Sequence, residues 1–120
     1  SWKSEPKARV FAQALLARAL LAQGRGHEAL AHARESHEQG ETSGVVEGAE
    51  GTVFLALTEC LLAAGENSAA LDVLRRAGQR LREMAEAIDD RPTRRLFLTA
   101  LPEHRRLLQL CQQAGMDTTR

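Results

Sequence analysis

Leu61-Leu62-Ala63-Ala64-Gly65-Glu66-Asn67-Ser68-Ala69-Ala70-Leu71 decides the fold, because the same pattern occurs 41 residues earlier, in Leu20-Leu21-Ala22-Gln23-Gly24-Arg25-Gly26-His27-Glu28-Ala29-Leu30. In both stretches an apolar helix end is followed by a glycine-containing turn and by a second helix that opens with Ala-Leu. Glycine ends helices readily because it adopts the left-handed conformation without a side-chain clash. A duplicated helix-turn-helix cannot bury its apolar face alone, so the pattern predicts that the two copies stack.

The apolar periodicity along the chain predicts an all-α fold. Helices are expected at residues 7–23, 27–39, 47–64, 68–89 and 93–100, and from Pro102 to Gly115. Gly40-Glu41-Thr42-Ser43-Gly44 is expected to be a loop, and Asn67 or Ser68 is expected to cap the fourth helix. These elements predict one domain, a short α-solenoid of two antiparallel helix-turn-helix repeats (residues 7–40 and 47–89) plus a C-terminal helical cap (residues 92–115).

Composition narrows the class of protein. A chain of 120 residues with 43% hydrophobic residues can build one core, and its formal net charge of zero indicates no general affinity for nucleic acid or membrane. No apolar run approaches the roughly 18 residues that a membrane span needs. Cys60 and Cys111 lie in leucine-rich patterns, which favours reduced core thiols in a cytoplasmic protein and leaves a disulfide between them as the alternative. Since the chain starts at Ser1, we expect it to be a fragment of a longer protein.

The duplicated segment resembles tetratricopeptide repeats. Four pairs of positions match the family pattern: Gly24 and Gly65 in the turn, Ala29 and Ala70 on the second helix, and Leu16 and Leu57 with Leu20 and Leu61 on the first helix. Other positions depart from it. Ala17 and Thr58 stand where the family usually has glycine, Ala33 and Leu74 where it has a bulky aromatic residue, and the period is 41 residues where the family has 34. The resemblance implies a helical-repeat surface that binds proteins.

The tail, Arg94-Arg95-Leu96-Phe97-Leu98-Thr99-Ala100-Leu101-Pro102-Glu103-His104-Arg105-Arg106-Leu107-Leu108, resembles the end of helical repeat arrays in large bacterial signalling proteins. Those arrays follow serine/threonine kinase domains or nucleotide-binding regulatory modules. The resemblance implies a sensor or scaffold region of such a protein. The chain itself carries no kinase signature.

No motif in the sequence predicts catalysis. His27, His32 and His37 are spaced by five residues, which rotates neighbouring members by about 140° around a helix, whereas a helical zinc site needs histidines at i and i+4. Glu103-His104 could act as an acid–base pair only within a pocket, and Gly24-Arg25-Gly26 lacks the residues of a phosphate loop. We therefore predict a protein that is not an enzyme, with no metal and no cofactor.

The charges fall into three blocks along the chain. Residues 1–34 carry a net charge of +4, residues 35–74 carry −8 with no Lys or Arg, and residues 75–120 carry +4. The acidic block predicts a surface for a basic protein or peptide partner, with Glu47, Glu50, Glu59 and Glu66 as its candidates. Two alternatives remain: the blocks neutralise one another between neighbouring helices, or the arginines of the C-terminal half bind nucleic acid.

The first predicted helix is apolar on nearly every side, although the end unit of a stack normally has a polar outer face. Val10, Ala14, Ala17 and Leu21 form one stripe, while Phe11, Leu15 and Leu16 face elsewhere. We predict that the stripe is a self-association face and that the isolated fragment is a homodimer. The sequence as a whole thus predicts a non-catalytic protein–protein interaction or scaffold module, with a nucleic-acid-binding regulatory domain as the less favoured alternative.

Overall fold

The structure, a computed structural model, describes residues 6–43 and 50–116, and within these ranges the secondary structure is α-helical with short turns and no strand. Six helices follow one another along the chain: α1 (Pro6–Ala22), α2 (Gly26–Ser43), α3 (Glu50–Ala63), α4 (Asn67–Glu86), α5 (Arg91–Ala100) and α6 (Pro102–Gln113). The all-α prediction is therefore confirmed for the described residues.

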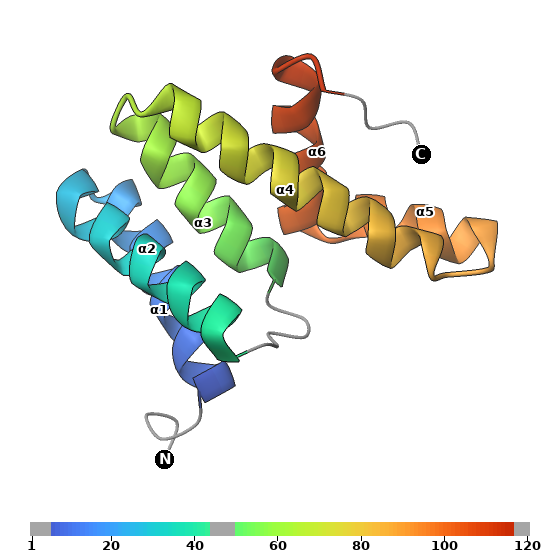
Figure 1. Ribbon diagram of the computed structural model, residues 1–120, viewed down its shortest axis with the longest axis horizontal. Helices are drawn as coiled ribbons and strands as arrows, with labels where there is room; N and C mark the ends of the chain where they lie inside the picture. The colour runs from blue at the N-terminus through green and yellow to red at the C-terminus, as the bar shows by residue number, and fades with distance from the viewer. Residues whose placement is uncertain (1–5, 44–49, 117–120) are drawn as a thin grey trace.

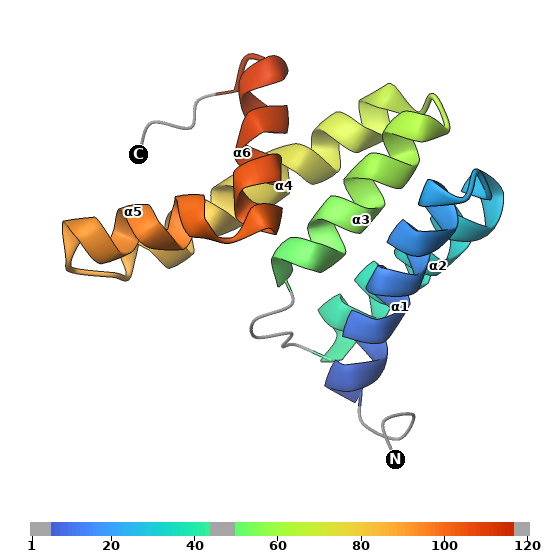
Figure 2. The ribbon, with the colours of Figure 1, turned by 180° about the vertical axis from the view of Figure 1, so that it is seen from behind.

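The helices pack mainly on their neighbours in sequence (Figure 1). α1 and α2 form one antiparallel pair and α3 and α4 form the next, with α3 packed against both helices of the first pair. α6 packs in turn against α3 and α4, whereas α5 contacts, among the described helices, only α4 and α6. From behind, α1, α3 and α6 follow one another across the molecule (Figure 2). The position of α6 relative to α3 and α4 thus matches that of α3 relative to α1 and α2.

Three glycines end α1, α3 and α6 in the same way. Gly24, Gly65 and Gly115 have φ angles of +79°, +77° and +74° and follow α1, α3 and α6. After α3, Glu66 N–H donates to the carbonyl of Leu61 and Gly65 N–H donates to that of Leu62; the equivalent two bonds close α1 and α6. This pairing of orphan carbonyls is the Schellman motif. The offset of 41 residues between the first two turns holds in the structure, because α2 starts at residue 26 and α4 at residue 67.

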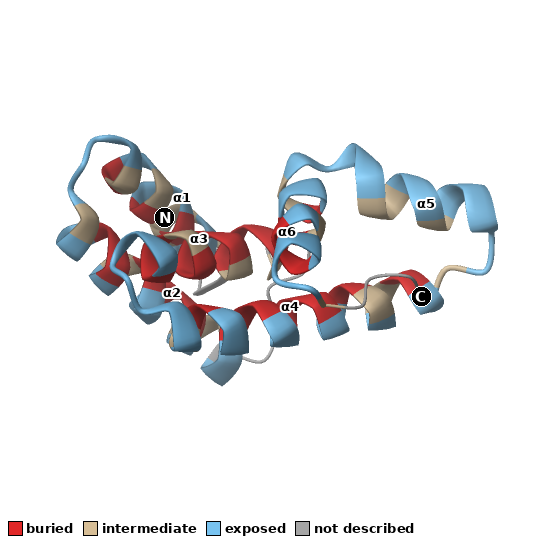
Figure 3. Cartoon of the chain, turned by 90° about the horizontal axis from the view of Figure 1, so that it is seen from above, coloured by how far each residue is buried: buried red, intermediate tan, exposed pale blue. Residues whose placement is uncertain are grey.

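Two clusters of buried residues form the core. The first joins α1, α2, α3 and the beginning of α4, through residues such as Ala17, Leu30 and Leu61. The second joins α3, α4 and α6 around Leu55 and Leu81. Figure 3 shows the buried positions running along α3 and the inner sides of its neighbours, whereas α5 has no fully buried residue. Cys60 lies in the first cluster and Cys111 in the second, and both thiols are free, so the disulfide alternative does not apply.

Two local predictions about the helices are wrong. The segment from Gly40 to Ser43 belongs to α2, not to a loop; Glu41 there lies next to Arg76 of α4 at 3.0 Å, and this tertiary contact favours the longer helix. The N-cap of α4 is Glu66, whose side chain makes no capping bond, and Asn67 is already helical. The part of the predicted loop beyond Ser43 lies outside the described residues.

Apolar residues recur along the inward face of α4. Leu74, Ala77 and Leu81 are buried, and Met84 and Ile88 are half-buried where α5 folds back. Asp90 starts α5 by accepting hydrogen bonds from the hydroxyl and from the backbone N–H of Thr93. The hydroxyl bond first, and the N–H bond second, hold the pKa of the Asp90 carboxyl below its usual value.

Candidate functional site

Each of the three described candidates of the predicted acidic surface pairs with arginine. Glu50 binds Arg80 of α4 through two hydrogen bonds of 2.7 and 3.2 Å, and Glu66 binds Arg34 of α2 through two of 3.1 and 3.2 Å. Glu50 begins α3 and Glu66 follows its end, so the length of α3, roughly 20 Å at the helical rise, lies between them. Glu47 lies outside the described residues. Five of the eight acidic residues of the block thus pair with arginines of the chain, namely Glu41, Glu50, Glu59, Glu66 and Asp72, as the alternative of mutually offsetting blocks predicted.

Glu59, the remaining candidate, links three helices. Its carboxylate lies 3.4 Å from Arg18 of α1 and 3.9 Å from Arg106 of α6. The ion pairs connect α1, α3 and α6 in the order in which Figure 2 shows them. At partly exposed positions such pairs contribute little stability, but they set the register between neighbouring helices.

The arginines predicted to contact nucleic acid are largely engaged within the protein. Arg76 binds Glu41 at 3.0 Å, and Arg80 binds Glu50. Arg94 donates two hydrogen bonds, of 2.7 and 3.0 Å, to the carbonyl of Ile88 and so closes the turn before α5. These arginines are spread over α4, α5 and α6, and aromatic residues, on which nucleic-acid bases could stack, make up 3% of the chain.

The histidines occupy separate environments. His27 is exposed, and the ring of His32 meets the amide of Gln13 at 3.1 Å. His37 is buried against Phe54, with ring centroids 5.7 Å apart, and burial lowers its pKa from the usual 6.5. Glu41 Oε1 lies 3.2 Å from its Nε2 without the alignment of a hydrogen bond.

His104 is buried against Phe97, and its Nδ1–H donates to the carbonyl of Phe97 at 2.9 Å. This bond holds the imidazole of His104 inside the protein, whereas the neighbouring Glu103 is half-buried. Among residues 6–43 and 50–116, no three His, Cys, Asp or Glu side chains gather as a metal site requires. Burial raises the pKa of both thiols, so neither Cys60 nor Cys111 is an activated nucleophile.

The predicted self-association face is wrong for three of its four residues. Val10, Ala14 and Ala17 are at most 1% exposed because they pack into the first core cluster, and Leu21 is half-buried beside it. The stripe is the side of α1 that faces α2 and α3. Periodicity alone could not distinguish it from the opposite side, because both sides of the helix are apolar.

The exposed apolar side of α1 is the one that carries Phe11, Leu15 and Leu16, which are 39%, 43% and 44% exposed. The positions 41 residues later in the sequence form a side of α3 that other helices cover. Thr52, Val53, Ala56, Leu57 and Cys60 of α3 are buried, and they correspond to Phe11, Ala12, Leu15, Leu16 and Ala19 of α1. On α3 this side packs against the first helix pair. The equivalent side of α1 has the same apolar character and no cover within the described chain.

The outward side of α6, the last helix in the series α1, α3 and α6, is polar. The outward positions of α6 include Arg105, Gln109 and Gln112, which are all exposed. The outward sides of α1 and α6 thus differ in polarity, and the apolar one is that of α1.

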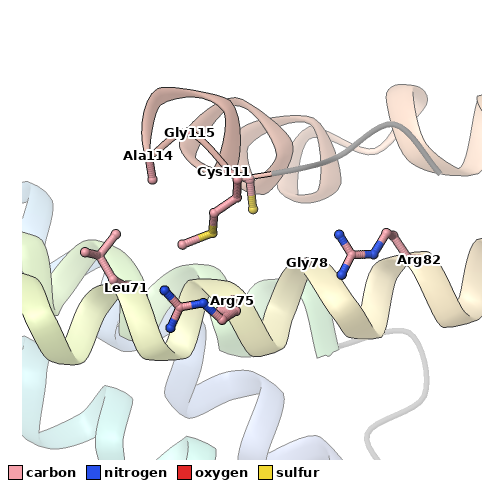
Figure 4. Close-up of a pocket in the computed structure, with 8 residues that line it drawn as sticks. Leu71, Arg75, Gly78, Arg82, Cys111, Ala114 and Gly115 are labelled. Carbon is pink, nitrogen blue, oxygen red and sulfur yellow. The ribbon is translucent and has the colours of Figure 1, made fainter.

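A groove lies between α4 and the C-terminal end of α6 and encloses about 400 Å³ (Figure 4). Its lining comprises Leu71, Arg75, Gly78 and Arg82 of α4 with Cys111, Ala114, Gly115 and Met116. The sequence did not predict this groove, because the duplicated segment has leucine both at the exposed position 71 and at the buried position 30.

Comparison of the chain with protein-family models, curated proteins and solved structures finds no match. In the described part of the chain, no helix combines the length and apolar character needed to cross a membrane.

Proposed function

We propose that this chain is a non-catalytic protein–protein interaction module, a short α-solenoid of tetratricopeptide-like units within a larger cytoplasmic regulatory or signalling protein. The observation that carries the proposal is the exposed side of α1. Phe11, Leu15 and Leu16 stand at the positions by which α3 packs against a helix pair, and they are uncovered. An apolar surface of this kind on a folded domain marks a site of association.

In the isolated chain, the available partner for this side of α1 is a second copy. The side alternates large and small residues, with Phe11 and Leu15 followed by Ala19. An antiparallel arrangement of two α1 helices centred on Leu15 sets Phe11 of each copy opposite Ala19 of the other. Large residues then meet small ones, which favours close packing around a two-fold axis. The homodimer is thus proposed through the side opposite to Val10, Ala14 and Ala17.

Sedimentation velocity tests this proposal on the 120-residue chain from about 5 to about 500 µM, the range in which interfaces of modest size dissociate. We expect a concentration-dependent dimer. Leu15→Glu should weaken dimerisation at least about tenfold, since it places an unpaired charge at the centre of the interface.

The matched control is Leu96→Glu, which makes the same change at a residue 61% exposed on α5 and should leave dimerisation unchanged. A chain that stays monomeric over the whole range, or a dimer that Leu15→Glu does not affect, would contradict the assignment of this surface.

A further inference from the structure

α5 packs against the rest of the molecule with one side only. Phe97 and Leu98 are half-buried against the second core cluster, and no residue of α5 is fully buried. The outer side of the helix is exposed, as its pale blue colour in Figure 3 shows. A shallow groove of about 410 Å³ follows this outer side and is lined by Arg91, Pro92, Arg95, Leu96 and Thr99.

The two arginines of this groove differ from arginines earlier in the chain. Six arginines before α5 each lie within 3.4 Å of a carboxylate, namely Arg18, Arg25, Arg34, Arg75, Arg76 and Arg80. The guanidinium groups of Arg91 and Arg95, by contrast, form no ion pair or hydrogen bond with the described residues. α5 contains no acidic residue, and the carboxylate of Asp90 at its start is engaged by Thr93. The groove thus carries two positive charges without a paired carboxylate.

An exposed leucine lies beside these charges. Leu96 is 61% exposed, more than any other large apolar residue of the described chain. Arg91 and Arg95 are four residues apart, as are Pro92 and Leu96, so each pair lies along one side of the helix. The groove therefore offers a strip of positive charge next to a strip of apolar surface, and a ligand that fits it carries negative charge and an apolar group.

The spacing of the charges matches an extended peptide. Four residues of an α-helix rise by about 6 Å. Alternate residues of an extended chain point to the same face and lie about 7 Å apart. Carboxylates at positions i and i+2 of such a peptide can therefore meet Arg91 and Arg95, and the side chain at i+4 then reaches Leu96 and Thr99.

Two other anionic partners fit this groove less well. A helix that binds a membrane surface presents a broad apolar face, whereas Leu96 is the one large apolar residue among those that line the groove. Single-stranded nucleic acid stacks its bases on accessible aromatic rings, but the ring of Phe97 packs against His104 with centroids 4.6 Å apart. An acidic peptide requires neither feature.

We propose that the outer side of α5 binds an extended acidic peptide segment of a partner protein. Two carboxylates at i and i+2 pair with Arg91 and Arg95, and an apolar side chain at i+4 rests on Leu96. The proposal is independent of the homodimer, because that interface uses α1.

Fluorescence anisotropy with the full 120-residue chain tests the proposal. The probe is a fluorescein-labelled peptide of glycine and serine that carries two glutamates at alternate positions and a leucine two residues after the second. We expect saturable binding with a dissociation constant below about 500 µM, weakened by added salt because the charges are exposed. Glutamine in place of both glutamates, or serine in place of the leucine, should weaken binding at least about fivefold.

Charge reversal in the protein gives the sharper readout. Arg91→Glu combined with Arg95→Glu should invert the preference, so that the chain favours the same peptide with lysine at both glutamate positions. Arg25→Glu combined with Arg34→Glu is the matched control, because it changes the net charge equally at two exposed arginines outside α5 and should leave the preference unchanged. Circular dichroism verifies that each variant is folded.

Leu96→Glu and Leu15→Glu distinguish this surface from the one on α1. Leu96→Glu should weaken peptide binding at least about fivefold without affecting dimerisation, and Leu15→Glu should do the reverse. The proposal would be overturned by no binding up to about 500 µM or by a preference that the double reversal on α5 does not alter. Tighter binding of phosphatidylserine vesicles or of single-stranded DNA through the same two arginines would also overturn it.

Discussion

Leu61→Ala is the substitution that best tests how the two helix pairs pack. Leu61 is 2% exposed and lies in the cluster that joins α1, α2, α3 and the beginning of α4. The substitution removes three carbon atoms, which at about 0.8 kcal/mol per buried methylene corresponds to roughly 2.4 kcal/mol of lost transfer free energy. The cavity that remains adds about 1–2 kcal/mol, so the free energy of unfolding should fall by about 3–4 kcal/mol.

The adjacent residue supplies the control. Leu62 is 39% exposed, and Leu62→Ala removes the same atoms from a site where solvent fills the space. Its effect should stay below about 1 kcal/mol, partly offset by the higher helix propensity of alanine. Urea unfolding followed by far-ultraviolet circular dichroism measures both values, with unchanged m-values as the criterion of an intact two-state transition. Equal effects at the two positions, or a loss below about 1 kcal/mol at Leu61, would refute the packing described for α3.

Three further predictions concern the second core cluster, a turn and a buried histidine. Leu74→Ala should cost about 2–5 kcal/mol of unfolding free energy in the same urea assay, because Leu74 is 3% exposed in the cluster that holds α6. Gly65→Ala should destabilise the chain by about 1–2 kcal/mol and lower its melting temperature, since the φ of Gly65 is +77°. Gly26→Ala is the control: Gly26 has no positive φ and nothing lies within 4 Å of the added carbon, so the melting temperature should stay unchanged or rise. Equal shifts for the two variants would contradict the turn geometry. For His37, burial lowers the pKa below 6.5 in the folded chain, so the unfolded chain takes up the proton first as the pH falls. Unfolding free energy measured between about pH 7.5 and about pH 5.5 should therefore drop more for the wild type than for His37→Gln, and parallel profiles would show that the ring is not desolvated.

Much of the helical framework could be predicted from local sequence. α1 ends at residue 22 and α3 at residue 63, because a glycine two residues later turns the chain in each case. The end of α2 could not be predicted in this way. Gly40 within a polar segment is typical of a loop, but the pairing of Glu41 with Arg76 of α4 extends the helix, and that contact joins residues 35 positions apart. Propensity contributes a few tenths of a kcal/mol per residue and is readily outweighed by tertiary contacts.

The candidate surfaces, too, could be predicted from the sequence only in part. The sequence shows that α1 is rich in apolar residues. It does not show which side of α1 is exposed, because apolar residues lie on both sides of this helix. The acidic block was visible as a run of charge, but charge along a chain does not specify which groups meet in space. Glu50, Glu59 and Glu66 each pair with an arginine at least 30 residues away in sequence.

The sequence by itself determined the helices, their turns and the 41-residue duplication, because these depend on local backbone preferences and on periodicity within a few turns of helix. Only the tertiary structure decided that α6 takes the place next to α3 and α4 that α3 takes next to α1 and α2, and that Phe11, Leu15 and Leu16 stay outside. It also decided that Leu71 faces an open groove while its equivalent Leu30 is covered. Burial and ion pairing are properties of residues brought together from distant parts of the chain, and identical local patterns acquire different roles according to what packs against them.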